Sequence, residues 1–288
     1  MSYRLFFTTC IFMYYILRIE SKVAYDKGSN SSSKSDIAKA SVNDIDEPLE
    51  NPRISKYPFM VSIERNDYKK YTHLCGGAIL NEHFVITAAH CMLKPRQLYA
   101  KDISVLAGSS LLFDKNATRF FVKATKRHPQ FVPFRGNDIL LLLMEREIPI
   151  DNIHFGNIDF RDTTRKSGEI PAHLLGWGQT QLNQTKELEE VPFKTIQDKD
   201  CFINYRFRYL TNSEVCAMNT RGPRGACDGD SGGPLVDETH QKLIGLLTYG
   251  RKPCQIDKPY AFTRISLFVK WIEQEMANML KLKAKAIK

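Results

Sequence analysis

Three side chains in this sequence have the types that nucleophilic catalysis uses, and each lies in a distinctive local stretch. Ser231 lies in the glycine-rich stretch Asp228–Pro234, His90 lies between two alanines and a cysteine, and Asp138 precedes an apolar run. A serine hydroxyl is a weak nucleophile at neutral pH and needs a base, which an imidazole oriented by a carboxylate supplies. The three residues are about 50 and 90 positions apart. A fold must therefore bring them together before they can act as one site.

The three stretches resemble, in the same chain order, those of the chymotrypsin-like serine proteases, over residues 54 to about 280. The resemblance implies that Ser231 attacks the substrate carbonyl while His90 serves first as general base and then as general acid. Asp138 would hold the imidazole in one tautomer. The N–H groups of Gly229 and Ser231 would form the oxyanion hole, where a glycine leaves room for the carbonyl.

The resemblance also indicates a specificity pocket, formed by Gly225, Ala226, Thr248, Tyr249, Gly250 and Tyr260. Gly225 stands where a trypsin-like pocket has its acidic floor, so a cationic side chain would meet no counter-charge. Tyr260 stands where the family commonly has a glycine, and its phenol would make the pocket shallow or close it. Asp228 would add an acidic rim. We therefore expect a small or medium apolar residue before the cleaved bond.

The cysteines and the N-terminus indicate secretion. Leu5–Leu17 is an apolar run of signal-peptide length after Arg4, so residues 1–20 are interpreted as a signal peptide; an uncleaved membrane anchor is the alternative. Removing Cys10 leaves six cysteines, for which sequence alone permits 15 pairings. The resemblance selects Cys75–Cys91, Cys201–Cys216 and Cys227–Cys254, which suit an oxidising compartment. Asn-x-Ser/Thr acceptors for glycosylation occur at Asn30, Asn116 and Asn183.

Residues 21–53 are polar and low in complexity, and they predict a disordered pro-segment. Family members usually mature by a cut before an Ile-Val-Gly-Gly-type sequence, whose ammonium then pairs with the acid before the nucleophile, here Asp230. This chain lacks such a sequence. Arg53–Ile54 looks like a cleavage site, but Ile54 is only four residues from Pro58, too short a reach. Ile45 has nearly the right spacing but is flanked by acids.

Short apolar stretches bounded by Gly, Pro, Asn or Asp recur from residue 57 to 264 and predict an all-β sandwich or barrel. The resemblance implies two six-stranded antiparallel β-barrels, about residues 54–160 and 161–265, with the active site between them. A helical apolar period after Ser266, a candidate cap, predicts a C-terminal helix that ends the domain at 281. Residues 282–288 form a basic tail.

The composition excludes some classes of function. The 288 residues are 43% hydrophobic, with a net charge of +9. No basic patch interleaves with aromatic residues, so nucleic-acid binding is not expected. No metal-ligand spacing occurs, and no cofactor is expected. We expect a monomer whose partners are protein or peptide substrates and protein protease inhibitors.

Two hypotheses remain. The intact triad, Gly229 and the predicted disulfides favour a secreted serine endopeptidase made as a zymogen. Tyr260 and the missing Ile-Val-Gly-Gly sequence favour a protease-fold binding or regulatory protein with little or no turnover.

Overall fold

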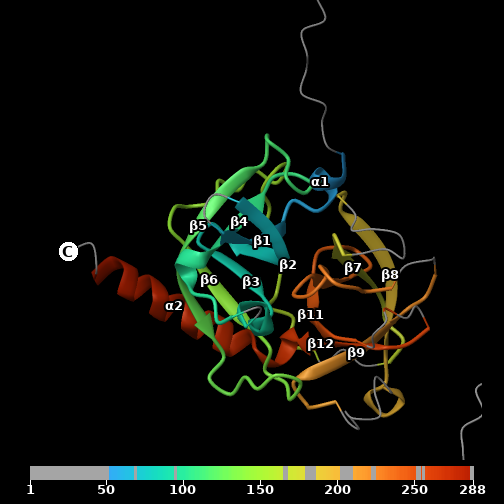
Figure 1. The fold of residues 1–288 in the computed structure, drawn as a ribbon. Helices are drawn as coiled ribbons and strands as arrows, with labels where there is room; N and C mark the ends of the chain where they lie inside the picture. Colours follow the sequence, from blue (N-terminus) through green and yellow to red (C-terminus); the bar gives the residue numbers. More distant parts are fainter. Residues whose placement is uncertain are drawn as a thin grey trace, which may run out of the picture. The chain divides into compact units, whose positions relative to one another are not determined.

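The computed structural model arranges twelve strands into two closed, six-stranded antiparallel barrels (Figure 1). It describes residues 52–67, 70–93, 96–164, 168–178, 186–201, 210–221, 225–250, 254 and 257–285. The predicted fold class is thereby confirmed, and the sandwich that the strand pattern alone allowed is excluded. The expected signal peptide and nearly all of the expected pro-segment lie outside the described residues.

Each barrel is a continuous ladder of neighbouring strands. The first has the order β1 (Met60–Asp67), β2 (Lys70–Asn81), β3 (Phe84–Thr87), β6 (Leu140–Met144), β5 (Thr118–Arg127) and β4 (Ile103–Ala107). The second has the order β10 (Pro234–Asp237), β11 (Leu243–Tyr249), β12 (Tyr260–Arg264), β9 (Glu214–Asn219), β8 (Glu189–Ile196) and β7 (Pro171–Gly176). Closure leaves neither sheet with an unpaired edge.

The strands owe their positions to their apolar side chains. Every residue of β4 and β6 is buried, whereas β5 directs Phe120 and Val122 inward and Phe121 outward. Alternation of this kind is typical of a strand with one face on the core. The sequence did not predict β9 or β10, because both are short and lack a clear alternation.

The two barrels approach closely where glycines face each other. The Gly76 N–H donates to the Ser231 carbonyl at 2.9 Å, and a Cβ on Gly76 would lie 2.8 Å from the Gly233 Cα. A side chain at Gly76 would therefore push β2 away from the loop that carries Ser231. Small residues at this junction let backbone pack on backbone.

The helices are few and mostly short. The described residues contain α1 (Pro52–Lys56), α2 (Val269–Lys285) and four 3₁₀ turns at Ala89–Met92, Ala100–Asp102, Asp198–Asp200 and Ile265–Leu267. The short α1 was not predicted, because Pro52 and its neighbours show no helical period. Among the described residues, no helix has the length and hydrophobicity that crossing a bilayer requires.

The C-terminal helix differs in detail from the prediction. It begins at Val269, and the Ser266 hydroxyl is buried with no hydrogen-bond partner in the part of the chain that the structure describes, so Ser266 does not cap it. The helix continues to Lys285, beyond the expected end at residue 281. It packs on the first barrel along β6 and buries Ile272, Met276 and Met279 (Figure 1).

We expect Ile272→Ala to lower the free energy of unfolding by about 2–5 kcal/mol, because the Ile272 side chain on α2 is fully buried and its truncation leaves a cavity. Gln274→Ala on the exposed face of the same helix should change it by less than about 0.5 kcal/mol. Chemical denaturation of both variants measures the difference. Equal effects would contradict the docking of this helix.

Candidate active site

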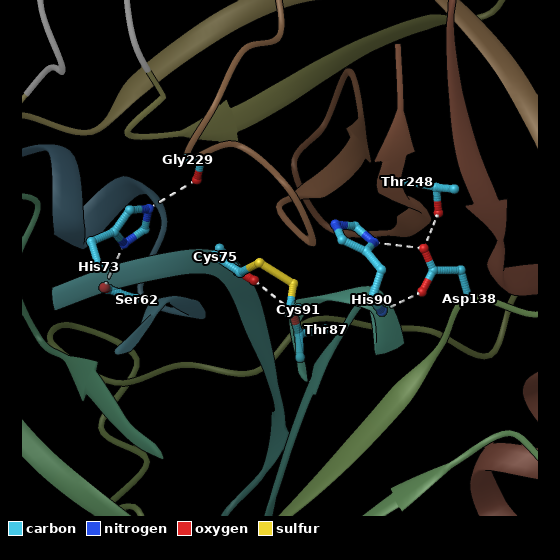
Figure 2. Close-up of a disulfide and its surroundings, with 10 residues drawn as sticks. Ser62, His73, Cys75, Thr87, His90, Cys91, Asp138, Gly229 and Thr248 are labelled. Atoms are coloured by element: carbon cyan, nitrogen blue, oxygen red, sulfur yellow. Dashed lines mark hydrogen bonds and ion pairs between the residues drawn. A yellow bond between two sulfur atoms is a disulfide. The ribbon is translucent and has the colours of Figure 1, made fainter. Parts of the chain in front are cut away.

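Strand pairing brings His90 and Asp138 together. β3 pairs with β6 in the register Thr87↔Leu140, so the residues just after β3 and just before β6 meet at one end of the pair. There the Asp138 Oδ1 accepts the His90 backbone N–H at 2.8 Å, and the Oδ2 accepts His90 Nδ1–H at 2.7 Å (Figure 2). Asp138 is 4% exposed, and the Thr248 hydroxyl also donates to its Oδ2 at 3.0 Å.

This geometry fixes the tautomer of His90. A carboxylate accepts hydrogen bonds, so the proton lies on Nδ1, and the lone pair of Nε2 points away from Asp138 (Figure 2). Within the described part of the chain, no hydrogen bond joins the Ser231 hydroxyl to His90. Such bonds are often long without substrate and shorten in the Michaelis complex. His90 therefore has the orientation that a general base needs.

The backbone around Ser231 presents two free amide donors. Neither the Gly229 N–H nor the Ser231 N–H donates a hydrogen bond among the residues that the structure describes. Gly229 has φ +102°, a conformation that L side chains rarely adopt, and a Cβ there would lie 3.1 Å from the Gly178 Cα. The glycine at this position is therefore required by backbone geometry. The two amides are the candidate oxyanion hole.

The Asp230 side chain holds the loop that carries Ser231 in place. Its carboxylate is fully buried, and it accepts the Gly178 N–H at 2.8 Å and the Cys227 N–H at 2.9 Å. A Cβ on Gly176 or Gly178 would overlap the carboxylate. The sequence predicted a role for Asp230 but did not identify these two glycines. The available signal in the sequence was that these two glycines flank Trp177 directly.

A second network, which sequence reasoning missed, holds Gly229. The His73 Nε2–H donates to the Gly229 carbonyl at 2.8 Å, and the Ser62 hydroxyl lies 2.7 Å from His73 Nδ1 (Figure 2). Because the carbonyl can only accept, Nδ1 must accept from Ser62. Burial lowers the pKa of His73 below its ordinary value of 6.5, so the ring is neutral at pH 7. The sequence offered one clue to this role, the position of His73 two residues before Cys75.

The three disulfides have the predicted pairing, Cys75–Cys91, Cys201–Cys216 and Cys227–Cys254. The first ties β2 to the turn that carries His90 (Figure 2). The third connects the loop that leads to Ser231 with the segment before β12. Two of the three bridges therefore constrain the candidate site directly.

Tyr260, one of the predicted pocket residues, is buried beside another of them, Gly250. Tyr260 is 3% exposed, and a Cβ on Gly250 would overlap its ring. The ring also contacts Phe193, with centroids 5.8 Å apart, and belongs to the same buried cluster as Ala226. Gly225 is buried and carries no charge. Tyr260 thus fills the space between Gly250 and the barrel core.

The neighbouring wall residue is also held in place. Tyr249 bonds to the Glu214 carboxylate, and burial, together with that carboxylate, raises the pKa of Tyr249. Burial likewise raises the pKa of Glu214, which accepts the Thr211 N–H at 2.8 Å. Phe134 packs edge-on against the Tyr249 ring at 5.7 Å. These contacts make the wall at Tyr249 rigid and aromatic.

The remaining predicted positions are less informative. Asn116 is exposed in a turn, where its amide N–H is held by Asp114, so its side chain is accessible. Asn30 and Asn183 lie outside the described residues. Asp228 is exposed beside the nucleophile loop. Ile54 is buried and lies within α1, and its carbonyl accepts the Tyr57 N–H.

The comparisons with known proteins agree with this geometry. The sequence model of the family described as Trypsin matches residues 49–272. Chymotrypsin-2 of Vespa crabro is 32% identical over 225 residues, which cover 76% of this chain and 94% of that protein. Trypsin of Sarcophaga bullata is 30% identical over 243 residues, with 81% and 90% covered. Granzyme B(G,H) of Mus musculus is 29% identical, with 77% and 87% covered.

Among solved structures, human heparin binding protein superimposes with a TM-score of 0.64 at 24% identity. The match covers 78% of this chain and 93% of that protein. At this identity the similarity shows the fold alone.

The neutral His73 predicts a pH dependence of stability. As the pH falls below about 6.5, the unfolded chain binds a proton at this residue that the folded chain resists, so stability is lost. We expect the loss between pH 7.5 and 5.5 to be smaller by about 1 kcal/mol in His73→Gln than in the wild type. Denaturation curves at both pH values measure it, with the exposed His154→Gln as control. An unchanged pH dependence in His73→Gln would contradict the buried, neutral ring.

Proposed function

The chain belongs to the trypsin family of serine proteases, and from this premise we propose that it is a secreted serine endopeptidase acting through an acyl-enzyme on Ser231. A domain of this family with three disulfides is consistent with an extracellular or secretory-pathway location. Membership of the family implies protein substrates. The observation that carries the proposal is the contact between buried Asp138 and partly exposed His90, in which both carboxylate oxygens bond to one histidine.

The proposed reaction uses the groups described above. The Ser231 Oγ attacks the substrate carbonyl and its proton passes to the His90 Nε2. The carbonyl oxygen becomes an oxyanion that the Gly229 and Ser231 N–H groups stabilise, by a few kcal/mol per donor. The His90 imidazolium then protonates the leaving amine. Water, deprotonated by the same nitrogen, releases the acid and restores the hydroxyl.

The proposed preference follows from the pocket. Gly225 and Ala226 offer no charge, and the Tyr260 ring occupies volume beside Gly250. A small or medium apolar residue such as Ala, Val or Leu fits this environment best. Discrimination by a hydrophobic pocket is only about 1–3 kcal/mol per methylene-sized change, so the preference should be graded.

A second candidate function rests on the same tyrosine. A ring that is 3% exposed and packed on Phe193 is part of the core, and a substrate side chain would have to displace it. This observation favours a protease-fold binding or regulatory protein with little turnover. The free oxyanion-hole amides and the oriented His90 favour the endopeptidase.

The first prediction from this proposal concerns Ser231. An organophosphonate probe should label the secreted, processed protein on Ser231, because the probe needs an activated hydroxyl and an oxyanion hole. Ser231→Ala should lose the label completely, and Ser110→Ala, at a buried serine outside the site, should keep it. Mass spectrometry of the labelled peptide identifies the residue. Absence of label on the wild type would support the binding-protein candidate.

The second prediction concerns Tyr260. Wild type should cleave peptides with Ala, Val or Leu before the scissile bond better than those with Arg or Lys. Tyr260→Gly should raise kcat/KM for Phe and Tyr peptides by about tenfold or more, because the glycine opens the pocket. Tyr99→Ala, at an exposed tyrosine, serves as the control and should leave the profile unchanged.

The outcomes for Tyr260 separate the two candidates. Activity that appears only in Tyr260→Gly would mean that the catalytic groups work and the pocket is closed. A wild-type profile dominated by Arg would overturn the proposed preference and point to Asp228 as the counter-charge.

A further inference from the structure

Three metal-ligating side chains from separate elements meet on the second barrel. They are His173 on β7, Glu190 on β8 and His240 in the turn between β10 and β11. The Glu190 Oε1 lies 2.8 Å from the His240 Nε2 and 3.4 Å from the His173 Nε2. One ligand atom from each residue lies within 4.8 Å of the other two. Both imidazoles therefore direct their Nε2 atoms at the Glu190 Oε1.

Strand register explains why His173 and Glu190 meet. β7 and β8 pair with His173 opposite Pro192 and Leu175 opposite Glu190. His173 and Glu190 are therefore diagonal neighbours on one face of the ladder, a separation that long side chains can span. The flanking residues Ala172 and Leu174 are buried, so His173 lies on the outer face.

The turn fixes the direction of His240. The Asp237 Oδ1 accepts the N–H groups of Gln241 and Lys242, and the Asp237 carbonyl accepts the His240 N–H at 2.9 Å. His240 itself has φ +59°, in the left-handed region that histidine adopts more readily than most residues. The ring is further held edge-on by Tyr57, with centroids 5.2 Å apart.

We propose that His173, Glu190 and His240 bind a Zn²⁺ ion. Zinc binds histidine nitrogen and carboxylate oxygen at about 2.0–2.2 Å, so ligand atoms around a tetrahedral ion lie about 3.3 Å apart. The separations of 2.8 and 3.4 Å lie on either side of that value. Two imidazoles and one carboxylate suit Zn²⁺ better than Ca²⁺ or Mg²⁺, which prefer oxygen ligands. Water would complete the coordination.

The second oxygen of Glu190 has a different task. Its Oε2 accepts from Lys56 Nζ at 2.8 Å and from the Tyr57 hydroxyl. A metal on Oε1 leaves these bonds in place, and they orient the carboxylate as outer partners of metal ligands do. The ion would thereby connect β7, β8 and the β10–β11 turn with the segment that precedes β1.

No metal site was expected from the sequence, because the three residues show none of the spacings typical of zinc motifs. They are separated along the chain by about 20 and 50 residues and meet only through the barrel. The proposed site is independent of the candidate active site, since none of its ligands belongs to the triad or the pocket.

Zinc titration of the tag-free, chelator-treated full chain tests the proposal by calorimetry. We expect one site per chain, at least a tenfold loss of affinity in Glu190→Gln, His173→Gln and His240→Asn, and no loss in His154→Gln. His154 is a matched control, an exposed histidine whose Nδ1 lies 3.1 Å from the Asp151 Oδ2. Asparagine tolerates the left-handed backbone at position 240, so His240→Asn preserves the turn.

Two further measurements distinguish the loss of a zinc ligand from misfolding of a variant. Cobalt should give the intense visible absorption of four-coordinate Co²⁺ in the wild type and lose it in His240→Asn. Zinc at 100 times its Kd should raise the Tm of the wild type by about 5 °C or more and leave that of the variants unchanged. The proposal is overturned if the wild type binds no zinc, or if a zinc site persists unchanged in both His173→Gln and His240→Asn. Equal loss in His154→Gln would also overturn it.

Discussion

One buried carboxylate joins the two barrels at the candidate active site. Asp138 precedes β6 of the first barrel and binds His90 beside β3, but the Thr248 hydroxyl on β11 also donates to its Oδ2. Its backbone carbonyl accepts the Thr263 hydroxyl on β12 at 2.7 Å. Removing a charge from water is costly unless hydrogen bonds replace the lost solvation. The two barrels must therefore stay docked for Asp138 to stay satisfied, so the inter-barrel geometry and the catalytic geometry are one constraint.

Backbone-only contacts make that constraint tight. At Gly232 and Gly233 a side chain would overlap Thr87 or the Leu175 carbonyl, and Gly229 has a backbone conformation reserved for glycine. The loop that carries Ser231 therefore packs against both barrels through its backbone, with no room for a side chain at Gly232 or Gly233. Hydrogen bonds fix the orientation of this loop: the Asp230 carboxylate accepts from Gly178 and Cys227, and His73 donates to the Gly229 carbonyl. Two amides of this loop donate no hydrogen bond within the described ranges, which suits a site that is built before substrate arrives.

Local motifs predicted that His90 and Asp138 belong together, as the structure shows, and tertiary contacts explain what the motifs missed. The stretches around His90, Asp138 and Ser231 were recognisable because their flanks are constrained by backbone geometry. His73 and Glu190 have no such flanks. Their roles arise from partners far along the chain: Gly229 lies 156 residues after His73, and His240 lies 50 residues after Glu190. The barrels were predicted from the resemblance, since alternation in short strands does not distinguish a barrel from a sandwich. The helix α1 was not predicted, because its five residues show no helical period of apolar side chains.

Tyr260 need not decide between enzyme and binding protein in an absolute sense. In the proposed pocket, a ring packed on Phe193 and beside Gly250 would make the open pocket a minor state, and a substrate would bind only that state. If closure is favoured by about 3 kcal/mol, the open state is populated at roughly 1%, and the apparent affinity falls about a hundredfold. The proposed chemistry at Ser231 uses His90 and the N–H groups of Gly229 and Ser231, none of which is part of the Tyr260 ring. An intact triad and weak turnover are therefore compatible in one molecule, and in the proposed protease the free energy of moving one aromatic ring would set the turnover.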